Sequence, residues 1–329
     1  MMAGAGRAVV VGVDVGGTTI SAGAVTPTGD VVVTEHLPTN VRVSGHAEAA
    51  IVDLITAVRE RTERGGFRIG GIGVGIPGPV DPATGRIGEH VPHVPELAGV
   101  ALGRRLEERF ALPTFVDNDV NALALAEWMF GAGRGTRSLV VLAPGTGFGA
   151  GIVLEGRLVR GVAGFGGEFG HATVKFDGRP CWCGGRGCLA NYASGRGIAE
   201  AARAGVAEQP GAPLLAAAGG DPLRITAPLV FRMAETGDTI AAAIVDEACR
   251  ALGAMLGTIV NGLNPEMVII TGGVAESLVA LETKILKAAA EYAFARALAS
   301  TRVTIVPSDK RTTMRGAAAL VLYETGGTP

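Results

Sequence analysis

Three cysteines and a histidine lie close together in the middle of the chain: His171, Cys181, Cys183 and Cys188. One imidazole nitrogen and three thiolates make a donor set typical of tetrahedral structural zinc. The CxC spacing is tighter than the common CxxC, so general zinc-finger patterns do not cover it. The alternative is unligated thiols beside a surface histidine. The density of soft donors favours zinc, which with four protein ligands would have no open position for chemistry.

Carboxylates form a second group with possible chemistry. Asp117, Asn118 and Asp119 stand between a strand pattern and a helix pattern. A carboxylate there can accept the proton of a sugar hydroxyl that attacks a terminal phosphate, and Asn118 can hold a neighbouring hydroxyl. Asn and Asp are also preferred N-cap residues, so a structural role is the alternative. Glu168 has no metal role and could face a substrate, or be a solvated carboxylate.

Three glycine-rich turns follow apolar strand patterns, at residues 14–19, 145–149 and 272–273. Glycines let backbone N–H groups approach phosphate oxygens, and threonine hydroxyls add donors. Asp14 could hold Mg²⁺ through water. A single turn of this kind could be a hairpin without a ligand, but three suit a nucleoside triphosphate that straddles two domains. The first turn is neither a Walker loop nor a dinucleotide-binding fingerprint.

The elements that would position these residues form a repeated pattern. An antiparallel meander of three strands over 8–36 is matched by strand patterns at 138–143, 148–154 and 158–161. Between the two units we expect a helix from about Ser44 to 63, a strand at 70–78, an irregular segment at 81–100, a helix at 103–110, a strand at 113–118 and a helix at 119–129. Two similar domains facing one another would place both glycine turns at one cleft.

The chain after the cysteine-rich segment is mostly helical in pattern. We expect helices at about 195–204, 212–218, 227–236, 238–261 and 278–297, a buried strand within 264–274, a strand at 302–307 and a last helix at 314–323. Trp128 lies on an apolar helical face and is expected in the core, and Cys249 is expected to be core filler. Trp182, between two candidate ligands, stays open as a stacking platform for sugar.

Composition limits the class of protein. The 329 residues are enough for two domains with a large apolar core, and 48% hydrophobic with 18% charged residues favours a compact soluble protein. A net charge of −2 gives no electrostatic footprint for nucleic acid or an anionic membrane. The longest apolar runs have the length of strands, well below the roughly 20 residues of a membrane helix, and no signal peptide precedes the first strand. We expect a cytoplasmic protein that acts on a small molecule.

Together these motifs resemble the ROK family of sugar kinases, especially bacterial glucokinases, from about residue 9 to 319. The resemblance is carried by DVGGTT, GIPGPVD, VDNDVNALA, APGTGFGAGIVLEGRLVRGVAGFGGEFGH, CWCGGRGC and NPEMVIITGGV. It implies an α/β, actin-like ATPase fold of two RNase-H-like domains with a ligand cleft between them. We expect a small domain over 1–121, joined by a helix at about 312–325, and a large domain over 122–311 that carries the zinc loop, 171–188.

The resemblance also implies an activity and roles for individual residues. ATP with Mg²⁺ would phosphorylate a sugar hydroxyl, typically O6 of a hexose, in a homodimer or homotetramer. Asp119 would be the catalytic base; Gly78, Asn118, Asp119, Glu168 and His171 would contact the sugar. His171 would bind structural zinc through its other ring nitrogen, with Cys181, Cys183 and Cys188. The nucleotide side would comprise Asp14, Gly16, Gly17, Thr18, Thr19, Gly145, Thr146, Gly147, Gly272 and Gly273.

The chain departs from the family pattern at three positions. Ala190 stands where glucose-binding members usually have a glutamate that grips hydroxyls near C1 and C2. Its absence should cost on the order of 1.5–3 kcal/mol per charged hydrogen bond. Pro92-His93 replaces a usual Pro-Asn, and Thr19 replaces a lysine that matters less. We therefore expect a substrate other than plain glucose, such as a sugar modified at C1 or C2, an N-acetylhexosamine or a cyclitol.

Two rival functions follow from the same resemblance. ROK repressors share this domain and sense sugars without catalysis, but they carry an N-terminal helix-turn-helix, and here the first phosphate turn already begins at Asp14. We therefore expect no DNA-binding domain. A degenerate kinase that only binds its ligand is the other rival, and the presence of Asp119 argues against it.

Overall fold

The computed structural model describes residues 7–39, 46–81, 83–89, 91, 93–307 and 309–326. These residues form two compact units, and each is described by itself. The first unit takes its residues from the ranges Met1–Arg137, Gly151–Gly166 and Asp309–Pro329, and the second from Ser138–Ala150 and Gly167–Ser308.

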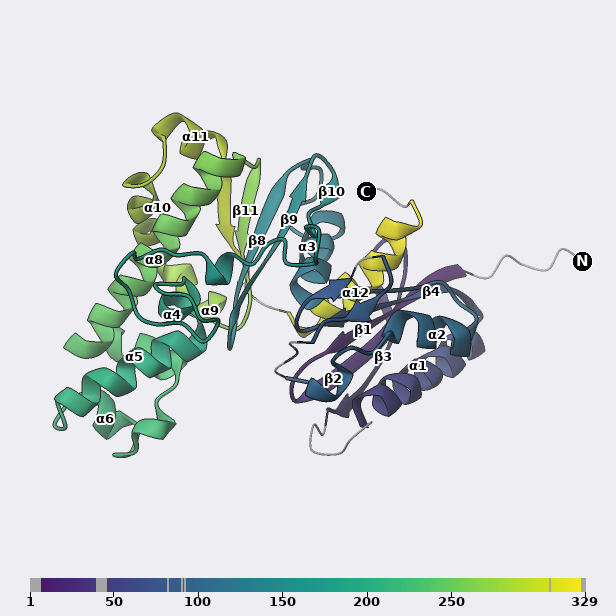
Figure 1. Ribbon diagram of the computed structural model, residues 1–329, viewed down its shortest axis with the longest axis horizontal. Helices are drawn as coiled ribbons and strands as arrows, with labels where there is room; N and C mark the ends of the chain where they lie inside the picture. The colour runs from purple at the N-terminus through teal and green to yellow at the C-terminus, as the bar shows by residue number, and fades with distance from the viewer. Residues whose placement is uncertain are drawn as a thin grey trace, which may run out of the picture. The chain divides into compact units, whose positions relative to one another are not determined.

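The first unit is built on a five-stranded sheet (Figure 1). The predicted meander is confirmed: β1 (Arg7–Val15), β2 (Thr19–Val25) and β3 (Val31–Pro38) pair antiparallel. Two more strands, β4 (Phe67–Ile76) and β7 (Thr114–Asn118), follow in parallel, β4 beside β1 and β7 beside β4. The strand order is therefore β3-β2-β1-β4-β7.

Successive side chains of β1 point to opposite faces of the sheet, and both sets are mainly apolar. A helix therefore covers each face. Val11 and Val13 belong to a core cluster with Ile51 of α1 (His46–Arg64). Val10, one position out of phase, packs with Ala318 and Val321 of α12 (Lys310–Glu324). The two helices thus lie on opposite faces. Ser44, where we expected α1 to begin, lies outside the described residues.

Glycines let α12 approach the sheet closely. A Cβ placed on Gly12 of β1 would lie 2.2 Å from the carbonyl oxygen of Met314, and one on Gly73 of β4 would lie 1.8 Å from that of Ala317. Real Cβ atoms do not come this close to backbone. The alternation of glycine with buried aliphatic residues in these strands is therefore a packing requirement of α12.

Gly73→Ala should destabilise the protein by about 3 kcal/mol, since the clash is with backbone and overpacking typically costs about 1–3 kcal/mol when side chains can adjust. Urea denaturation would measure the loss. Gly70→Ala in the same strand is the matched control, because its Cβ would lie 3.7 Å from the nearest atom, the oxygen of Val9. Equal stability of the two variants would contradict the packing argument.

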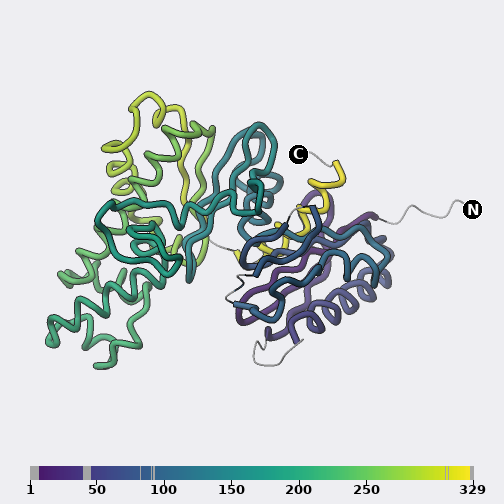
Figure 2. Tube along the Cα trace, in the orientation of Figure 1, coloured from purple at the N-terminus to yellow at the C-terminus, as the bar shows by residue number. Residues whose placement is uncertain are grey.

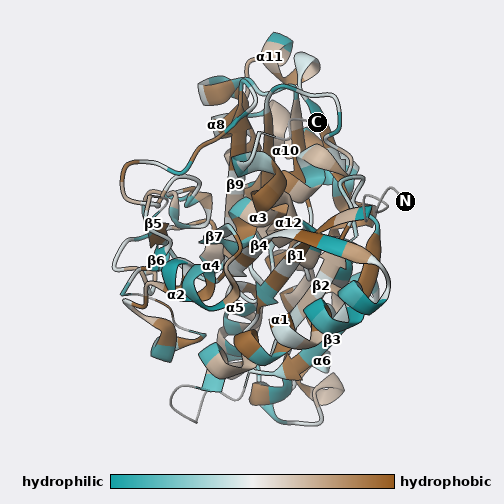
Figure 3. Ribbon diagram, turned by 90° about the vertical axis from the view of Figure 1, so that its right-hand side faces the viewer, coloured by the Kyte–Doolittle hydropathy of each residue, from teal (hydrophilic) through white to brown (hydrophobic). Residues whose placement is uncertain are grey.

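The segment after β4 contains more structure than the irregular loop we predicted. β5 (Val80–Asp81) and β6 (Arg86–Ile87) form a short hairpin, and a 3₁₀ turn, η1 (Pro95–Leu97), follows. Two helices complete this part, α2 (Leu102–Phe110) and α3 (Asp119–Met129), both close to their predicted bounds. Much of α2 is hydrophilic in Figure 3, as expected of a helix with one apolar face.

The C-terminal helix α12 returns to the first unit (Figure 2). Gly316 lies against α3 so closely that a Cβ there would be 2.4 Å from the carbonyl oxygen of Ala122. Since α3 packs along α12, residues 122–137 group with the first unit. The compact units therefore divide at 137/138 and 308/309, with residues 151–166 also in the first unit, whereas the expected domain limits were 121/122 and 311/312. Trp128 of α3 is buried, as predicted.

The second sheet repeats the topology of the first. The meander strands are β8 (Leu139–Pro144), β9 (Phe148–Leu154) and β10 (Arg157–Leu158), followed by β11 (Met267–Ile270) and β12 (Arg302–Ile305). Their order, β10-β9-β8-β11-β12, places a parallel pair beside the first meander strand, as in the first sheet. This equivalence confirms the predicted repeat. A boundary between the two compact units falls within β9.

Helices make up most of the second unit (Figure 1). The predicted ones are α5 (Gly195–Glu208), α6 (Pro213–Ala217), α7 (Ala227–Glu235) and α8 (Thr239–Leu263), where Cys249 is buried as expected. Three short elements were not predicted: η2 (Phe169–His171), α4 (Ala190–Ala193) and η3 (Pro222–Arg224). Among the helices described, none is long and apolar enough to cross a membrane.

The single helix predicted at 278–297 is wrong. The chain forms α9 (Ala275–Leu278), η4 (Val279–Leu281), α10 (Glu282–Ala290) and α11 (Ala295–Ser300). The main break lies at Phe294, whose backbone is extended, with φ −60° and ψ 123°. Asn261 of α8 replaces the lost helical bonds: its amide donates to the oxygen of Tyr292 and its oxygen accepts from the N–H of Phe294. A tertiary contact therefore overrides the local helical pattern.

Candidate functional site

The predicted site residues fall into two sets, one in each unit. The first unit holds Asp14, Gly16, Gly17, Thr18, Thr19, Gly78, Asn118 and Asp119, and the second holds Gly145, Thr146, Gly147, Glu168, His171, Cys181, Cys183, Cys188, Gly272 and Gly273.

Asn118 joins the end of β7 to the start of α3. Its side-chain oxygen accepts from the backbone N–H groups of Val120 at 2.9 Å and Asn121 at 3.2 Å, so it is the N-cap of α3. Its amide nitrogen donates to the oxygen of Gly78 at 3.1 Å, and Gly78 has a φ of 111°, which favours glycine. The capping role considered as an alternative is therefore present, and it fixes the orientation of Asn118.

Asp119 is the first residue of α3 and is half-buried. Its carboxylate accepts from the N–H of Val120 at 2.9 Å. Gly75 of β4 lies beneath it, because a Cβ on Gly75 would be 3.4 Å from the Asp119 Cα. A helix N-terminus favours a negatively charged side chain, so this position suits a carboxylate.

Asp117 lies behind this turn and is almost fully buried. One carboxylate oxygen accepts from the N–H of Asn118 at 2.7 Å and from the side chain of Asn121 at 2.8 Å. The other accepts from Nε of Arg160 at 2.5 Å. Burial opposes the charge of Arg160, but Asp117 and then Glu324 more than offset it, and the pKa of the guanidinium is raised above its ordinary value.

The first glycine turn is closed by its own backbone and by a threonine. The N–H of Gly16 donates to the oxygen of Thr19 at 3.0 Å. The hydroxyl of Thr39 donates to the oxygen of Gly16 at 2.6 Å, and its N–H donates to the oxygen of Thr18 at 3.0 Å. Thr39 is fully buried, and the sequence analysis did not single it out. Gly17 and Thr18 at the tip are exposed, as a phosphate-binding turn requires.

Asp14 is the residue before the last one of β1, just ahead of this turn. Burial raises the pKa of its carboxyl above the ordinary value, and a hydrogen bond from the hydroxyl of Thr313, at 2.8 Å, opposes the rise. Within the described part of the chain, no basic side chain forms an ion pair with Asp14. A desolvated carboxylate without a cationic partner is a suitable outer-sphere ligand for hydrated Mg²⁺.

The second glycine turn is held by the start of α5. The N–H groups of Gly195 and Arg196 donate to the oxygens of Gly145 at 2.8 Å and Thr146 at 3.1 Å, and Ser194 caps the helix. A Cβ on Gly145 or Gly147 would meet no atom within 4 Å. Packing therefore does not require glycine at these two positions, and their bare backbone is open to close approach by a phosphate.

The reason for a glycine differs between Gly272 and Gly273. Gly272 has a φ of 122°, and a Cβ there would also lie 2.8 Å from the oxygen of Pro144, so the fold itself demands glycine. Gly273 has open space where a Cβ would be. Three glycines in the two turns of the second unit thus have an uncovered backbone: Gly145, Gly147 and Gly273. This arrangement fits a nucleotide.

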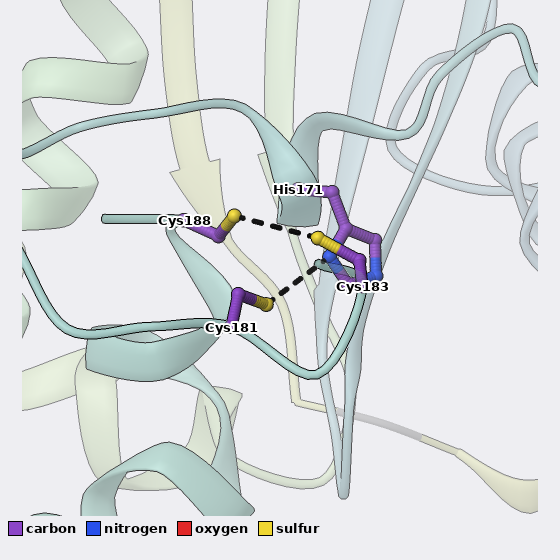
Figure 4. Close-up of side chains that lie close together, drawn as sticks. All are labelled: His171, Cys181, Cys183 and Cys188. Atoms are coloured by element: carbon purple, nitrogen blue, oxygen red, sulfur yellow. Dashed lines mark hydrogen bonds between the residues drawn. The ribbon is translucent and has the colours of Figure 1, made fainter. Parts of the chain in front are cut away.

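The predicted zinc ligands come together in one cluster (Figure 4). Their ligand atoms lie within 4.8 Å of one another; Cys181 Sγ is 3.6 Å from His171 Nδ1, and Cys183 Sγ is 3.7 Å from Cys188 Sγ. Zinc bonds of about 2.3 Å to sulfur and about 2.05 Å to nitrogen give tetrahedral edges of about 3.8 Å and about 3.6 Å. The distances from Cys181 to His171 and from Cys183 to Cys188 agree with such edges, so the residues suit a zinc ion.

Neighbouring residues hold the cysteine loop in this shape. The side chain of Asn191 donates to the oxygens of Arg179 and Pro180, and the hydroxyl of Tyr192 accepts from the N–H of Arg179. Burial, together with the adjacent thiols, raises the pKa of Cys188 to about 12. A dication is the partner that would let these crowded thiols ionise.

Glu168 immediately precedes the η2 turn, and His171 is the last residue of that turn. Although Glu168 as a residue is exposed, the surrounding protein desolvates its carboxyl and raises its pKa, and His171 partly opposes the rise. His171 faces the cluster with Nδ1, and its other ring nitrogen points away from the sulfurs (Figure 4). Trp182 is 43% exposed and lies edge-on to His171, with Arg196 over its ring. It is therefore not core.

The positions that depart from the family pattern lie in different surroundings. Ala190 opens α4 and is fully buried, and its oxygen accepts from the hydroxyl of Ser194 at 2.6 Å. His93 is exposed beside the first glycine turn; a Cβ on Gly17 would lie 3.2 Å from the His93 Cβ. Pro92 lies outside the described residues.

The ROK family profile matches residues 10–324 of the sequence. The chain belongs to the ROK family. A glucokinase of Halalkalibacterium halodurans is 38% identical over 272 residues, which cover 81% of each protein. A glucokinase of Thermotoga maritima is 32% identical over 318 residues, 97% of this chain and 98% of that protein.

Solved structures of ROK proteins share the fold. The ROK glucokinase of Streptomyces griseus, in complex with glucose and AMPPNP, has a TM-score of 0.74 and 30% identity over 95% of this chain and 98% of its own. This similarity confirms the predicted actin-like ATPase fold, and the glucokinase relatives support the predicted class, a sugar kinase. The regulator NagC of Escherichia coli is also 32% identical, over 74% of this chain and 58% of its own length.

Proposed function

We propose that this ROK protein uses ATP and Mg²⁺ to phosphorylate a hydroxyl of a hexose or sugar-like substrate, at the 6-position or its equivalent. The observation that carries the proposal is the first turn of α3, where Asp119 offers a carboxylate and Asn118 is fixed by three hydrogen bonds. The glucose and AMPPNP held by the Streptomyces relative support both substrate classes.

In this mechanism Asp119 accepts the proton of the attacking hydroxyl. Phosphoryl transfer passes through a loose transition state, so orientation of the hydroxyl matters more than full deprotonation. Asn118, Gly78, Glu168 and His171 would orient the sugar. Glu168 suits this task, since a partly desolvated carboxylate makes strong hydrogen bonds to hydroxyl groups.

The glycine turns would bind the nucleotide through backbone N–H groups. Gly16, Gly17, Thr18 and Thr19 would contact phosphate in the first unit, and Gly145, Thr146, Gly147, Gly272 and Gly273 would contact the nucleotide in the second. Mg²⁺, held through water by Asp14, would supply charge neutralisation on the phosphates.

Zinc would be structural in this proposal. His171 and the three cysteines supply four ligands, which leaves no position for a reacting water. Binding through Nδ1 leaves the second ring nitrogen of His171 for a sugar hydroxyl. The metal would therefore act on substrate recognition, by fixing the ring of His171 and the turn that begins at Glu168.

Ala190 makes a substrate other than plain glucose the expected one. A panel of glucose, N-acetylhexosamines and cyclitols with ATP, followed by ADP release, should show the highest kcat/KM for a member other than glucose. Ala190→Glu should raise kcat/KM for glucose about 10-fold or more, because one charged hydrogen bond contributes about 1.5–3 kcal/mol.

Ala190→Gln is the matched control for that prediction, because glutamine fills the same buried position without the charge. It should improve glucose turnover much less than Ala190→Glu. If the wild type already prefers glucose, and the glutamate variant changes nothing while remaining folded, the hypothesis of altered recognition is wrong.

A sugar sensor without catalysis is the second candidate, and the similarity to NagC favours it. The same ADP assay separates the two functions. Sugar-dependent ADP release supports the kinase, whereas sugar binding without any ADP release across the panel supports the sensor.

A further inference from the structure

Arg160 and Asp117 form an ion pair behind the first turn of α3. Arg160 Nε lies 2.5 Å from Asp117 Oδ2, and their side chains are 18% and 5% exposed. Arg160 follows β10, and Asp117 lies in β7, so two segments far apart in sequence meet here. Both residues belong to the first unit. A pair this buried is sensitive to loss of either partner, because the remaining charge is uncompensated.

The C-terminal helix fixes the direction of the Arg160 guanidinium. Its Nη2 bonds to Glu324, and its Cζ lies 5.7 Å from the ring centroid of Tyr323. The hydroxyl of Tyr323 accepts from the N–H of Leu158 at 3.0 Å, which ties α12 to the same segment. Arg160 is therefore held by one carboxylate and one ring, and presents its Nε to the other carboxylate.

Asp117 connects Arg160 to Asn118 and Asn121 through hydrogen bonds. The oxygen that does not contact Arg160 accepts from the N–H of Asn118 and from the side chain of Asn121. Both donors lie at the junction of β7 and α3, on either side of Asp119. Rotation of the Asp117 carboxylate would break two bonds that hold the junction, and the junction carries the proposed base.

We propose that Arg160 is a positioning residue for phosphoryl transfer, which holds Asp117 and, through it, the turn that carries Asn118 and Asp119. The inference rests on the proposed role of Asp119 as the base. It extends that role to a residue that touches neither substrate. A shift of about 1 Å at a reacting group can cost about 100-fold in rate, so loss of Arg160 should appear in kcat.

A cavity gives access to Arg160 from outside. Its volume is about 290 Å³, and Arg160, Glu324, Arg104 and Thr114 are among the residues that line it. Once the Arg160 side chain is truncated, we expect a small guanidinium ion to enter this space and to reach Asp117, the partner that Arg160 has left. Arg104 lines the same cavity but pairs with the exposed Glu108, so it is a matched control.

The decisive experiment compares Arg160→Ala with Arg104→Ala in steady-state kinetics at a temperature where both are folded by circular dichroism. We expect kcat of Arg160→Ala to fall about 10- to 100-fold, with KM for ATP nearly unchanged. Guanidinium at a non-denaturing concentration should restore at least a tenth of the kcat that the variant has lost. Arg104→Ala should keep wild-type kcat and show no response to guanidinium. A folded Arg160→Ala with kcat within threefold of wild type would overturn the proposal, as would a loss of kcat that guanidinium does not restore.

Two milder variants decide the question if Arg160→Ala does not fold. Arg160→Lys keeps the charge but loses the paired geometry toward Asp117 and Glu324, and should lower kcat at least threefold. Glu324→Gln weakens only the outer contact and should lower kcat less than Arg160→Lys. Wild-type kcat in both would overturn the proposal. Asp119→Asn, measured alongside, tests the proposed function separately: an active Asp119→Asn refutes the base, whereas an inactive one beside an unaffected Arg160→Lys refutes only the positioning role.

Discussion

Asp119→Asn should lower kcat by about 10²- to 10⁴-fold, the usual contribution of a general base, with little change in KM for the sugar. Asparagine has the same shape, so it keeps the hydrogen bond from the N–H of Val120 and the packing over Gly75. It has no proton-accepting carboxylate. The loss should therefore fall on the transition state and leave ground-state binding almost intact.

Initial rates over a grid of sugar and ATP concentrations would measure this effect. Asp53→Asn, at an exposed position of α1, removes the same charge far from the junction in sequence and should leave kcat unchanged. Asn118→Ala is informative beside it: loss of the N-cap should cost about 1 kcal/mol of stability, and loss of the amide should raise KM for the sugar. A variant Asp119→Asn that loses kcat/KM only through KM would contradict the role of a base.

The strands of both sheets, and the meander that begins each sheet, could be predicted from local patterns. Alternating apolar residues and glycine turns mark each meander, and the parallel strands appear as short buried runs, because each pattern reports on one strand and its own neighbours. The prediction of a single helix over residues 278–297 was wrong because a partner distant in the sequence, and not the local pattern, decides the structure there. Their helical pattern is real, but Asn261 from a distant helix binds Tyr292 and Phe294 and breaks it.

The clustering of His171 with the three cysteines was likewise predictable, since these residues are close in sequence and few residue types bind zinc. The residues that hold the candidate site in position could not be predicted from the sequence. Thr39 binds Gly16 of a glycine turn, 23 residues earlier, and Arg160 pairs with a carboxylate 43 residues earlier. A single threonine or arginine carries no periodic signal, and such partners become visible only when the strands that carry them are placed.

Removal of zinc should have the second large effect. We expect one zinc per chain by elemental analysis, and its removal by a chelator should lower Tm by about 3 °C or more, because each kcal/mol lost lowers Tm by about 1.5 °C in a chain of 329 residues. Structural zinc contributes about 10–16 kcal/mol in isolated zinc-finger peptides, but in this protein the four candidate ligands adjoin one loop of a much larger fold, so we expect a smaller effect. KM for the sugar should rise together with the loss of stability, since Glu168 and His171 adjoin this loop.

Cys183→Ser and Cys249→Ala separate the metal from the other effects of losing a thiol. Cys183 lies in the cluster, and its serine variant should lose zinc; Cys249 lies buried in α8, and its alanine variant should keep one zinc and an unchanged KM. Zinc uptake by the metal-free protein should also release protons, because the pKa of about 12 at Cys188 keeps that thiol protonated until a dication arrives. Zinc affinity should therefore fall as pH falls. A purified, active protein without stoichiometric zinc would remove the metal from the account of sugar recognition and leave the glycine turns and Asp119 to support phosphoryl transfer alone.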